Sequence, residues 1–141
     1  MLVLHEIIKL YGEIECIRRL GTIRIGKDSL ALLLEYLGSG PTAQHAVRVA
    51  RLNRFGVAEP EMHFELRSGV WLPFYLCNRT TDAELFLYRF TGAKVVRVDR
   101  GAGARLIEMA GILDLNLWAE GFVEAAEENL YHPLFAAGGA Q

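Results

Sequence analysis

The sequence predicts an α+β fold: an antiparallel meander sheet of about five strands, covered by N-terminal and C-terminal amphipathic helices. Two patterns predict it. Residues 3–20 and 105–130 carry apolar side chains three and four positions apart, the spacing of a helix with one buried face. Residues 62–90 instead alternate apolar and polar side chains, as half-buried strands do. The 141 residues, 52% of them apolar, suit one domain, residues 1–132, followed by a flexible tail at 133–141.

The N-terminal helix is predicted over residues 3–20. Arg18 and Arg19 stand near its end, where cations oppose the negative pole of the helix dipole. Gly21 follows, and glycine readily takes the left-handed conformation that ends a helix. The apolar stripe of this helix consists of Val3, Ile7, Leu10, Ile14 and Ile17.

Three strands are predicted between this helix and residue 56. Residues 22–25 alternate and predict a short strand, and the apolar run 29–37 has the length of a strand and predicts a central one. Residues 43–55 fit two structures. Pro41 and Gly56 at the two ends favour a helix, whereas the alternation of residues 46–52 favours a strand, which is our preferred interpretation.

The clearest signal is a β-hairpin formed by residues 62–67 and 70–77, joined at Ser68-Gly69. Met62, Phe64 and Leu66 are expected to face the helices, and Val70, Leu72, Phe74 and Leu76 to share one face of the second arm. Because Pro73 has no N–H to donate, we expect an edge or a bulge there.

The remaining elements complete the meander and the second helix. Residues 84–90 predict a further strand with Phe86, Tyr88 and Phe90 on one side, and residues 94–99 are either a short strand or a connection. Residues 105–130 predict the C-terminal helix, which Gly121 interrupts or kinks.

Charge and composition narrow the function classes. Fifteen Lys and Arg against 17 Asp and Glu give a net charge of −2, so no overall basic character draws the chain to a polyanion. The charge is uneven, with +3 over residues 1–104 (14 against 11) and −5 over residues 105–141 (1 against 6). No apolar run approaches the roughly 18 residues of a membrane span, and no basic export signal precedes one. Cys16 and Cys77 are therefore expected to be reduced, buried thiols in a cytoplasmic protein.

Residues that carry catalysis are not grouped in the sequence. Histidines and cysteines occur singly, without the paired spacing typical of zinc ligands, and the nucleophile motif Gly-x-Ser-x-Gly is absent. We accordingly assign no catalytic, cofactor-binding or metal-binding residue. The alternating row Glu61, His63 and Glu65 is interpreted as the solvated face of a half-buried sheet. An enzyme in which Cys77 and His63 form a thiolate–imidazole pair is the least favoured function.

Several short motifs resemble an uncharacterised bacterial family of single-domain proteins that are often encoded on plasmids and other mobile elements. They are Leu20-Gly21, Pro60-Glu61-Met62, Trp71 with Pro73, and Trp118 with Gly121-Phe122, and the similarity spans about residues 5–122. The resemblance implies an α+β fold and a mobile-element origin. It implies no catalytic residues.

Two functions follow as hypotheses. The first is a small non-enzymatic interaction module with a protein partner, or a homo-oligomer formed through an exposed sheet edge or helix. The second is an accessory nucleic-acid-binding protein of a plasmid or phage, which the recurrence of arginine every third position from Arg48 suggests. Trp71, Phe74, Phe86, Tyr88 and Trp118 are candidates either for an aromatic core or for a partner surface. The candidate binding surface consists of Arg48, Arg51, Arg54, Trp71, Tyr75 and Arg79.

Overall fold

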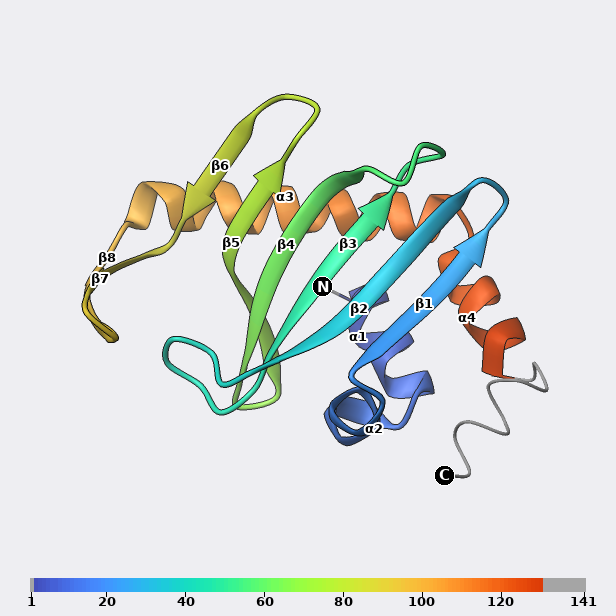
Figure 1. Cartoon of the computed structure of the whole chain (residues 1–141), viewed down its shortest axis with the longest axis horizontal. Coiled ribbons are helices and arrows are strands. Elements are labelled where there is room, and N and C mark those ends of the chain that lie inside the picture. Colours follow the sequence, from blue (N-terminus) through green and yellow to red (C-terminus); the bar gives the residue numbers. More distant parts are fainter. Residues whose placement is uncertain (1, 131–141) are drawn as a thin grey trace.

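The computed structural model describes residues 2–130 and has the predicted α+β architecture (Figure 1). The helices lie on one side of the larger sheet, as a layered α+β fold requires. The elements in chain order are α1 (Leu2–Leu10), α2 (Glu13–Leu20), β1 (Thr22–Lys27), β2 (Leu30–Gly38), β3 (Ala46–Leu52), β4 (Ala58–Arg67), β5 (Val70–Asn78), β6 (Ala83–Phe86), β7 (Tyr88–Thr91), β8 (Lys94–Val98), α3 (Arg100–Ala119) and α4 (Phe122–Leu130).

The larger sheet is a six-stranded antiparallel meander in the order β1-β2-β3-β4-β5-β6, one strand more than the predicted number. Each strand pairs with its neighbours in sequence, so short turns suffice to connect them. The strand interpretation of residues 46–52 is confirmed as β3, and residues 30–38 form an interior strand, as predicted.

The predicted helix over residues 3–20 is wrong in one respect: it is two helices. Gly12 and Glu13 have φ angles of 88° and 67°, which lie in the left-handed region and stop the hydrogen-bond ladder between α1 and α2. The break lets Leu4, Ile8 and Ile17 all reach the core, although they do not lie on one straight helical stripe.

The predicted strand over residues 84–90 also divides, at Leu87. The Leu87 N–H donates to the Phe74 carbonyl of the larger sheet at 3.0 Å, while the Leu87 carbonyl accepts from the Asp99 N–H at 2.8 Å. After this residue the chain leaves the larger sheet, and β7 pairs with β8 in a separate two-stranded sheet. Residues 94–98 are therefore a strand rather than a connection.

The C-terminal helix begins earlier than predicted. Asp99 caps α3, because its carboxylate accepts from the Ala102 N–H at 3.0 Å. Gly101 and Gly103 consequently lie inside the first turns of α3. Gly121, with φ of 81°, separates α3 from α4, which confirms the predicted interruption.

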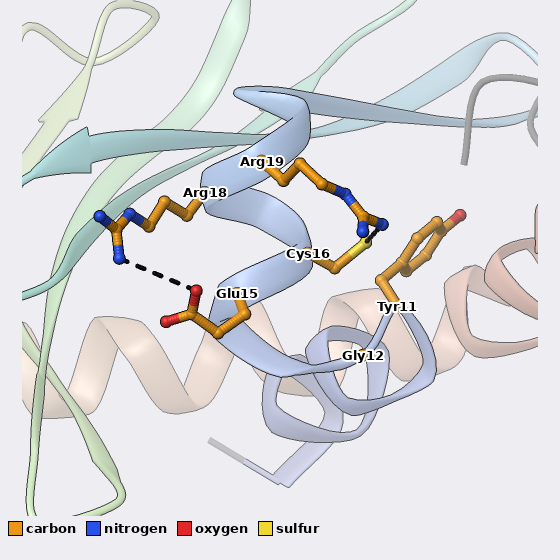
Figure 2. Close-up of a pocket in the computed structure, with 6 residues that line it drawn as sticks. All are labelled: Tyr11, Gly12, Glu15, Cys16, Arg18 and Arg19. Atoms are coloured by element: carbon orange, nitrogen blue, oxygen red, sulfur yellow. Dashed lines mark hydrogen bonds and ion pairs between the residues drawn. The ribbon is translucent and has the colours of Figure 1, made fainter. Parts of the chain in front are cut away.

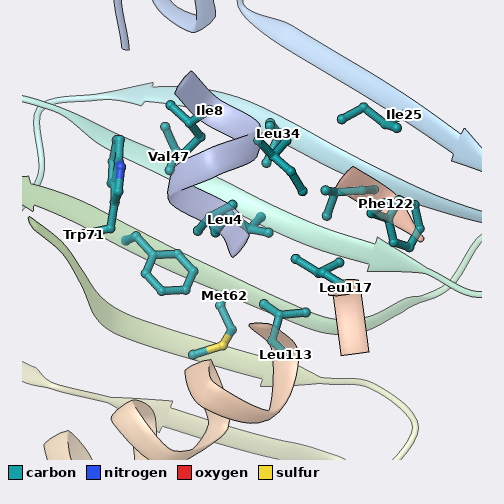
Figure 3. Close-up of a cluster of buried hydrophobic side chains, with 14 of the residues drawn as sticks. Leu4, Ile8, Ile25, Leu34, Val47, Met62, Trp71, Leu113, Leu117 and Phe122 are labelled. Atoms are coloured by element: carbon teal, nitrogen blue, oxygen red, sulfur yellow. The ribbon is translucent and has the colours of Figure 1, made fainter. Parts of the chain in front are cut away.

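One hydrophobic core fills the space between the helices and the larger sheet (Figure 3). Met62 and Phe64 are fully buried there, as predicted for that side of β4. Leu4 of α1, Leu117 of α3 and Phe122 of α4 reach the same cluster, so burial of apolar surface holds the layers together.

The predicted alternation of β5 is wrong across its middle, where a β-bulge interrupts it. His63 faces Tyr75 and the next residue, Phe64, faces Pro73, so Phe74 is an additional residue in β5. Of the edge and the bulge that were predicted at Pro73 because it has no N–H to donate, the structure has the bulge. As a result Trp71 and Leu76 are both buried with the core, and Phe74 and Tyr75 both contact the His63 ring on the opposite face.

None of the helices in residues 2–130 combines the length and the apolar composition needed to cross a bilayer. The predicted tail at 133–141, together with residues 131–132 of the predicted domain, lies outside the described residues.

Candidate functional site

The structure separates the arginines of the predicted binding surface. Arg48 lies on the sheet face that points away from the helices, which we call the open face, and its Nη2 is 2.8 Å from Glu61 Oε1. Arg51 lies on the helix side, where its Nε donates to Glu120 Oε1 at 2.7 Å. Both guanidinium groups are thus neutralised by carboxylates, whereas phosphate binding needs several converging cations.

The other members of that predicted surface are equally dispersed. Arg54 is in the loop after β3, with its guanidinium 4.8 Å from the Phe55 ring centroid. Arg79 follows β5 and is exposed. Trp71 belongs to the core and offers almost no surface to a partner. Tyr75 is on the open face, where its hydroxyl donates to Glu84 at 2.7 Å.

Cys77 and His63 lie on the same face of the sheet, as predicted, but they oppose different residues. His63 pairs with Tyr75, and Cys77 pairs with Glu61. His63 Nε2 is 2.9 Å from Glu61 Oε2, so the carboxylate orients the imidazole. Both cysteines are free and half-buried, rather than fully buried as the sequence suggested. Within residues 2–130, His, Cys, Asp and Glu side chains form no group of three that would hold a metal ion.

An aromatic groove occupies the open face beside β5. It has a volume of about 400 Å³. The rings that meet there come from the β5 bulge and from the two halves of the divided strand, so Phe86, Tyr88 and Phe90 do share one side. Phe86 and Phe90 are 54% and 50% exposed, which leaves the groove accessible. Its lining residues are Glu61, His63, Phe74, Tyr75, Phe86, Tyr88 and Phe90.

Hydrogen bonds and burial shift the pKa values of two residues that line this groove, Glu61 and Tyr88. The hydrogen bond from Arg48 is the main reason that the pKa of Glu61 lies below its ordinary value, and the contact with His63 lowers it further. Burial is the main reason that the pKa of Tyr88 lies above 10.0. Glu61 is therefore an ionised carboxylate at neutral pH, and Tyr88 remains a hydrogen-bond donor.

Glu65 is a buried carboxylate, which contradicts the interpretation of its row as a solvated face. The loop between β2 and β3 covers it: the Thr42 N–H donates to Glu65 Oε2 at 3.0 Å, and the Thr42 hydroxyl donates to Oε1. Tyr88 donates to the same Oε1 at 2.7 Å. No sequence signal marks this site, because the covering loop and β7 come from distant parts of the chain.

A second feature is a set of exposed apolar side chains on α3. Ile107, Leu115 and Trp118 are 65%, 68% and 66% exposed, and Ile107 also borders a hollow that Pro73 and Leu87 line. Together with Ile112 and Gly111 they define what we call the outer face of α3. Ile107, Gly111, Leu115 and Trp118 fall within a sector of about 80° on a helix of 3.6 residues per turn. Neighbouring exposed apolar side chains of this kind are typical of an interaction site.

Another hollow lies at the turn that leads into α2 (Figure 2) and has a volume of about 570 Å³. All of its lining residues fall within residues 11–19; among them Arg18 Nη1 is 3.8 Å from Glu15 Oε2, and Arg19 Nη2 is 4.0 Å from Cys16 Sγ. Burial is the largest influence on the nearby Tyr11 hydroxyl and raises its pKa. No catalytic group pair is formed by these side chains, and we assign the hollow no function.

Protein-family models, curated proteins and solved structures were each compared with the chain, and none matches it. The resemblance to a plasmid-encoded family therefore stays a prediction from short motifs.

Proposed function

We propose that the protein is a small non-enzymatic interaction module that pairs with a second copy of itself through the outer face of α3. The observation that carries this proposal is the exposed apolar stripe formed by Ile107, Leu115 and Trp118. Removing such side chains from water is the main driving force of protein association. The sequence alone left a sheet edge and a helix as alternatives, and the stripe favours the helix.

The spacing of the stripe suits a twofold-symmetric, antiparallel helix pair. Ile107 and Leu115 each stand four positions from Gly111, and Ala104 and Trp118 each stand seven positions from it. Two copies that cross at Gly111 place Ile107 against Leu115 of the second copy, and Trp118 against Ala104. Trp118 then meets the small Ala104, and Ile107 and Leu115 pack together as two apolar side chains, so the same surface is complementary to itself.

Gly111 also allows the close approach that such a crossing needs. It is exposed, and an added Cβ would meet nothing within 4 Å in the isolated chain. Packed helix axes lie about 8–10 Å apart, at the short end of this range where small residues meet. Within a single chain glycine destabilises a helix interior relative to alanine, and the crossing supplies a reason for glycine at this position.

The ends of α3 carry opposite charges, which favours the antiparallel orientation. The β7–β8 hairpin and the start of α3 form one end in Figure 1, and α4 lies at the other. With 20 residues, α3 is about 30 Å long. An antiparallel pair brings the basic end of one copy to the acidic end of the other, whereas a parallel pair opposes like charges. The exposed groups are Arg89, Lys94, Arg97, Arg100 and Arg105 at the first end and Glu124, Glu127 and Glu128 at the second.

The cytoplasmic location predicted from the sequence belongs to the same proposal. Its support is chemical: Cys16 and Cys77 are both free thiols, and free thiols persist in reducing compartments.

Sedimentation equilibrium tests the proposal. The wild-type protein is expected at twice the chain mass of 15.8 kDa over a wide concentration range. Leu115→Glu places a charge in the middle of the interface and is expected to yield monomers. Phe55→Glu, at a loop residue that is 74% exposed, is the matched control and should stay dimeric. A wild-type protein that is monomeric at every concentration contradicts the proposal.

A further inference from the structure

We propose that the aromatic groove on the open face binds a small organic cation with a quaternary ammonium head, of the trimethylammonium type. The groove lies on the sheet face opposite the helices, so the site is independent of the proposed self-association. Its volume of about 400 Å³ falls in the range of small-ligand sites.

Ring faces supply the first part of the argument. The Tyr75 ring centroid is 4.7 Å from that of His63 and 5.1 Å from that of Phe86. The Tyr88 centroid is 6.3 Å from that of Phe74 and 6.4 Å from that of Phe90. Because Phe74 also contacts the His63 ring, the rings form one continuous row that lines the hollow. The electron-rich faces of phenol and phenyl rings attract cations within about 6 Å of their centroids, and quaternary ammonium groups are recognised in cages of this kind.

Charge supplies the second part. Three carboxylates are hydrogen-bonded to the wall of the groove: Glu61 contacts His63, Glu65 accepts from Tyr88, and Glu84 accepts from Tyr75. Arg48 pairs with Glu61, and Arg67 acts electrostatically on Tyr88. The three acidic side chains that hydrogen-bond the groove wall favour a cation over a neutral or anionic ligand.

The polar groups at the groove are already hydrogen-bonded, and this favours a cation that has no N–H groups of its own. The two Glu61 oxygens are engaged by Arg48 and His63, and the Tyr75 and Tyr88 hydroxyls donate to carboxylates. A primary ammonium or a guanidinium would find fewer acceptors here than in water, because most of the oxygens at the groove wall already have a partner. A quaternary ammonium has no N–H to satisfy, so ring faces and the carboxylate field suffice to bind it.

The exposure of Phe86 and Phe90 supports a ligand-binding role for this groove rather than a purely structural one. Phe86 and Phe90 present about half of their surface to solvent. Both rings line the groove and therefore remain accessible to a ligand bound in it.

Calorimetric titration of the full chain with choline, and with its neutral isostere 3,3-dimethylbutan-1-ol, tests the inference. The two molecules share one shape and differ in charge, so the proposal predicts that choline binds at least about tenfold more tightly, which corresponds to ~1.4 kcal/mol. Equal affinities, or no saturable binding of choline, would overturn it.

Two variants locate the site. Phe86→Leu removes a ring face but keeps an apolar side chain, and is expected to weaken choline binding about fivefold. Phe55→Leu, at an exposed ring in the loop after β3, should leave it unchanged, and equal losses in both variants would contradict the assignment. Leu115→Glu should bind choline normally, so a failure of self-association and a failure of this inference are distinguishable.

The source of the head group is tested separately. Phosphatidylcholine vesicles present the same trimethylammonium group at a membrane surface. We propose that the ligand is a free small molecule, and we therefore expect that the protein does not co-sediment with such vesicles. Co-sedimentation that choline competes away would overturn the assignment to a free ligand.

Discussion

The hydroxyl of Tyr88 in β7 donates a 2.7 Å hydrogen bond to the carboxylate of Glu65 in β4, a side chain with no exposed surface. The two residues belong to different sheets. Their bond ties the β7–β8 hairpin, and with it the start of α3, to the open face of the meander. Thr42, in the loop between β2 and β3, donates a further hydrogen bond to this carboxylate. A buried carboxylate without its donors is costly, so these three segments are expected to depend on one another.

Tyr88→Phe removes one donor from Glu65 and leaves the ring in place. We expect the free energy of unfolding to fall by about 1.5–3 kcal/mol, the usual cost of losing a hydrogen bond to a charged group. Tyr75→Phe is the matched control, because its hydroxyl bonds Glu84 in an exposed position and its loss should cost under about 1 kcal/mol. Urea denaturation measures both. Equal losses of unfolding free energy in the two variants would show that the hydrogen bond from Tyr88 to Glu65 stabilises the protein no more than an exposed one.

Gly40→Ala tests how closely the β2–β3 loop covers Glu65. A Cβ at this position would lie 2.8 Å from both Cβ and Oε2 of Glu65, which is too close without movement. We expect a destabilisation of about 1–3 kcal/mol, as for other overpacked sites. Gly26→Ala is the control, because no atom lies within 4 Å of its added Cβ. If thermal denaturation shows the same midpoint for both variants, the loop does not seal the site.

The ion pair between Glu61 and Arg48 is expected to add to the free energy of unfolding at neutral pH and to lose this contribution in acid. The hydrogen bond from Arg48 depresses the folded-state pKa of Glu61 below its ordinary 4.5. Glu61 therefore contributes stability above pH 4.5, and this contribution is lost as the pH falls through the depressed folded-state value. The difference in unfolding free energy between wild type and Glu61→Gln is expected to be largest at neutral pH and to shrink in acid.

Arg48→Met checks the cause of that contribution. If Arg48 is the main partner, Arg48→Met should lose most of the same pH-dependent stability, and the double variant with Glu61→Gln should lose little more. Fully additive losses would place the cause elsewhere. Denaturant titrations at a series of pH values provide the measurement.

The two tryptophans report separately on the proposed pairing. Trp118 is exposed on the outer face of α3, whereas Trp71 is in the core. If two copies pair there, dilution should shift the emission of the wild type to longer wavelength as Trp118 meets water. Trp118→Phe leaves only Trp71, whose emission should not change while the chain stays folded. An emission maximum that is independent of concentration in the wild type argues against burial of Trp118.

The layered fold could be predicted from local patterns because each pattern reports one buried face. Met62 and Phe64 alternate with polar residues, and their side of β4 indeed lies against the helices. The pattern failed where the backbone departs from regular geometry. Gly12 has a left-handed φ that divides the first helix, and the bulge at Phe74 shifts the faces of β5 by one residue.

The candidate sites were less predictable for a different reason. The strand interpretation already sends Arg48 and Arg51 to opposite faces, but nothing in the sequence shows that each meets a glutamate there. Glu65 was indistinguishable from Glu61 and His63 in the row, because Thr42 and Tyr88 cover it only in the folded chain. The outer face of α3 was hidden because apolar residues occur on exposed as well as buried sides of that helix, and periodicity reports a buried face clearly only when the opposite face is polar.

Disulfide trapping at Gly111 tests the antiparallel pairing most directly. At the crossing of two helices whose axes are about 8–10 Å apart, with Cα atoms about 2.3 Å from each axis, the two Gly111 Cα atoms lie about 3.4–5.4 Å apart. The upper part of that range is within the reach of a disulfide. In a Cys16→Ser, Cys77→Ser background, Gly111→Cys is predicted to oxidise to a covalent dimer. Asn116→Cys, equally exposed but about 140° away around α3, should stay monomeric under the same conditions. A Gly111→Cys protein that forms no covalent dimer, or an Asn116→Cys protein that forms one as readily, would contradict the account.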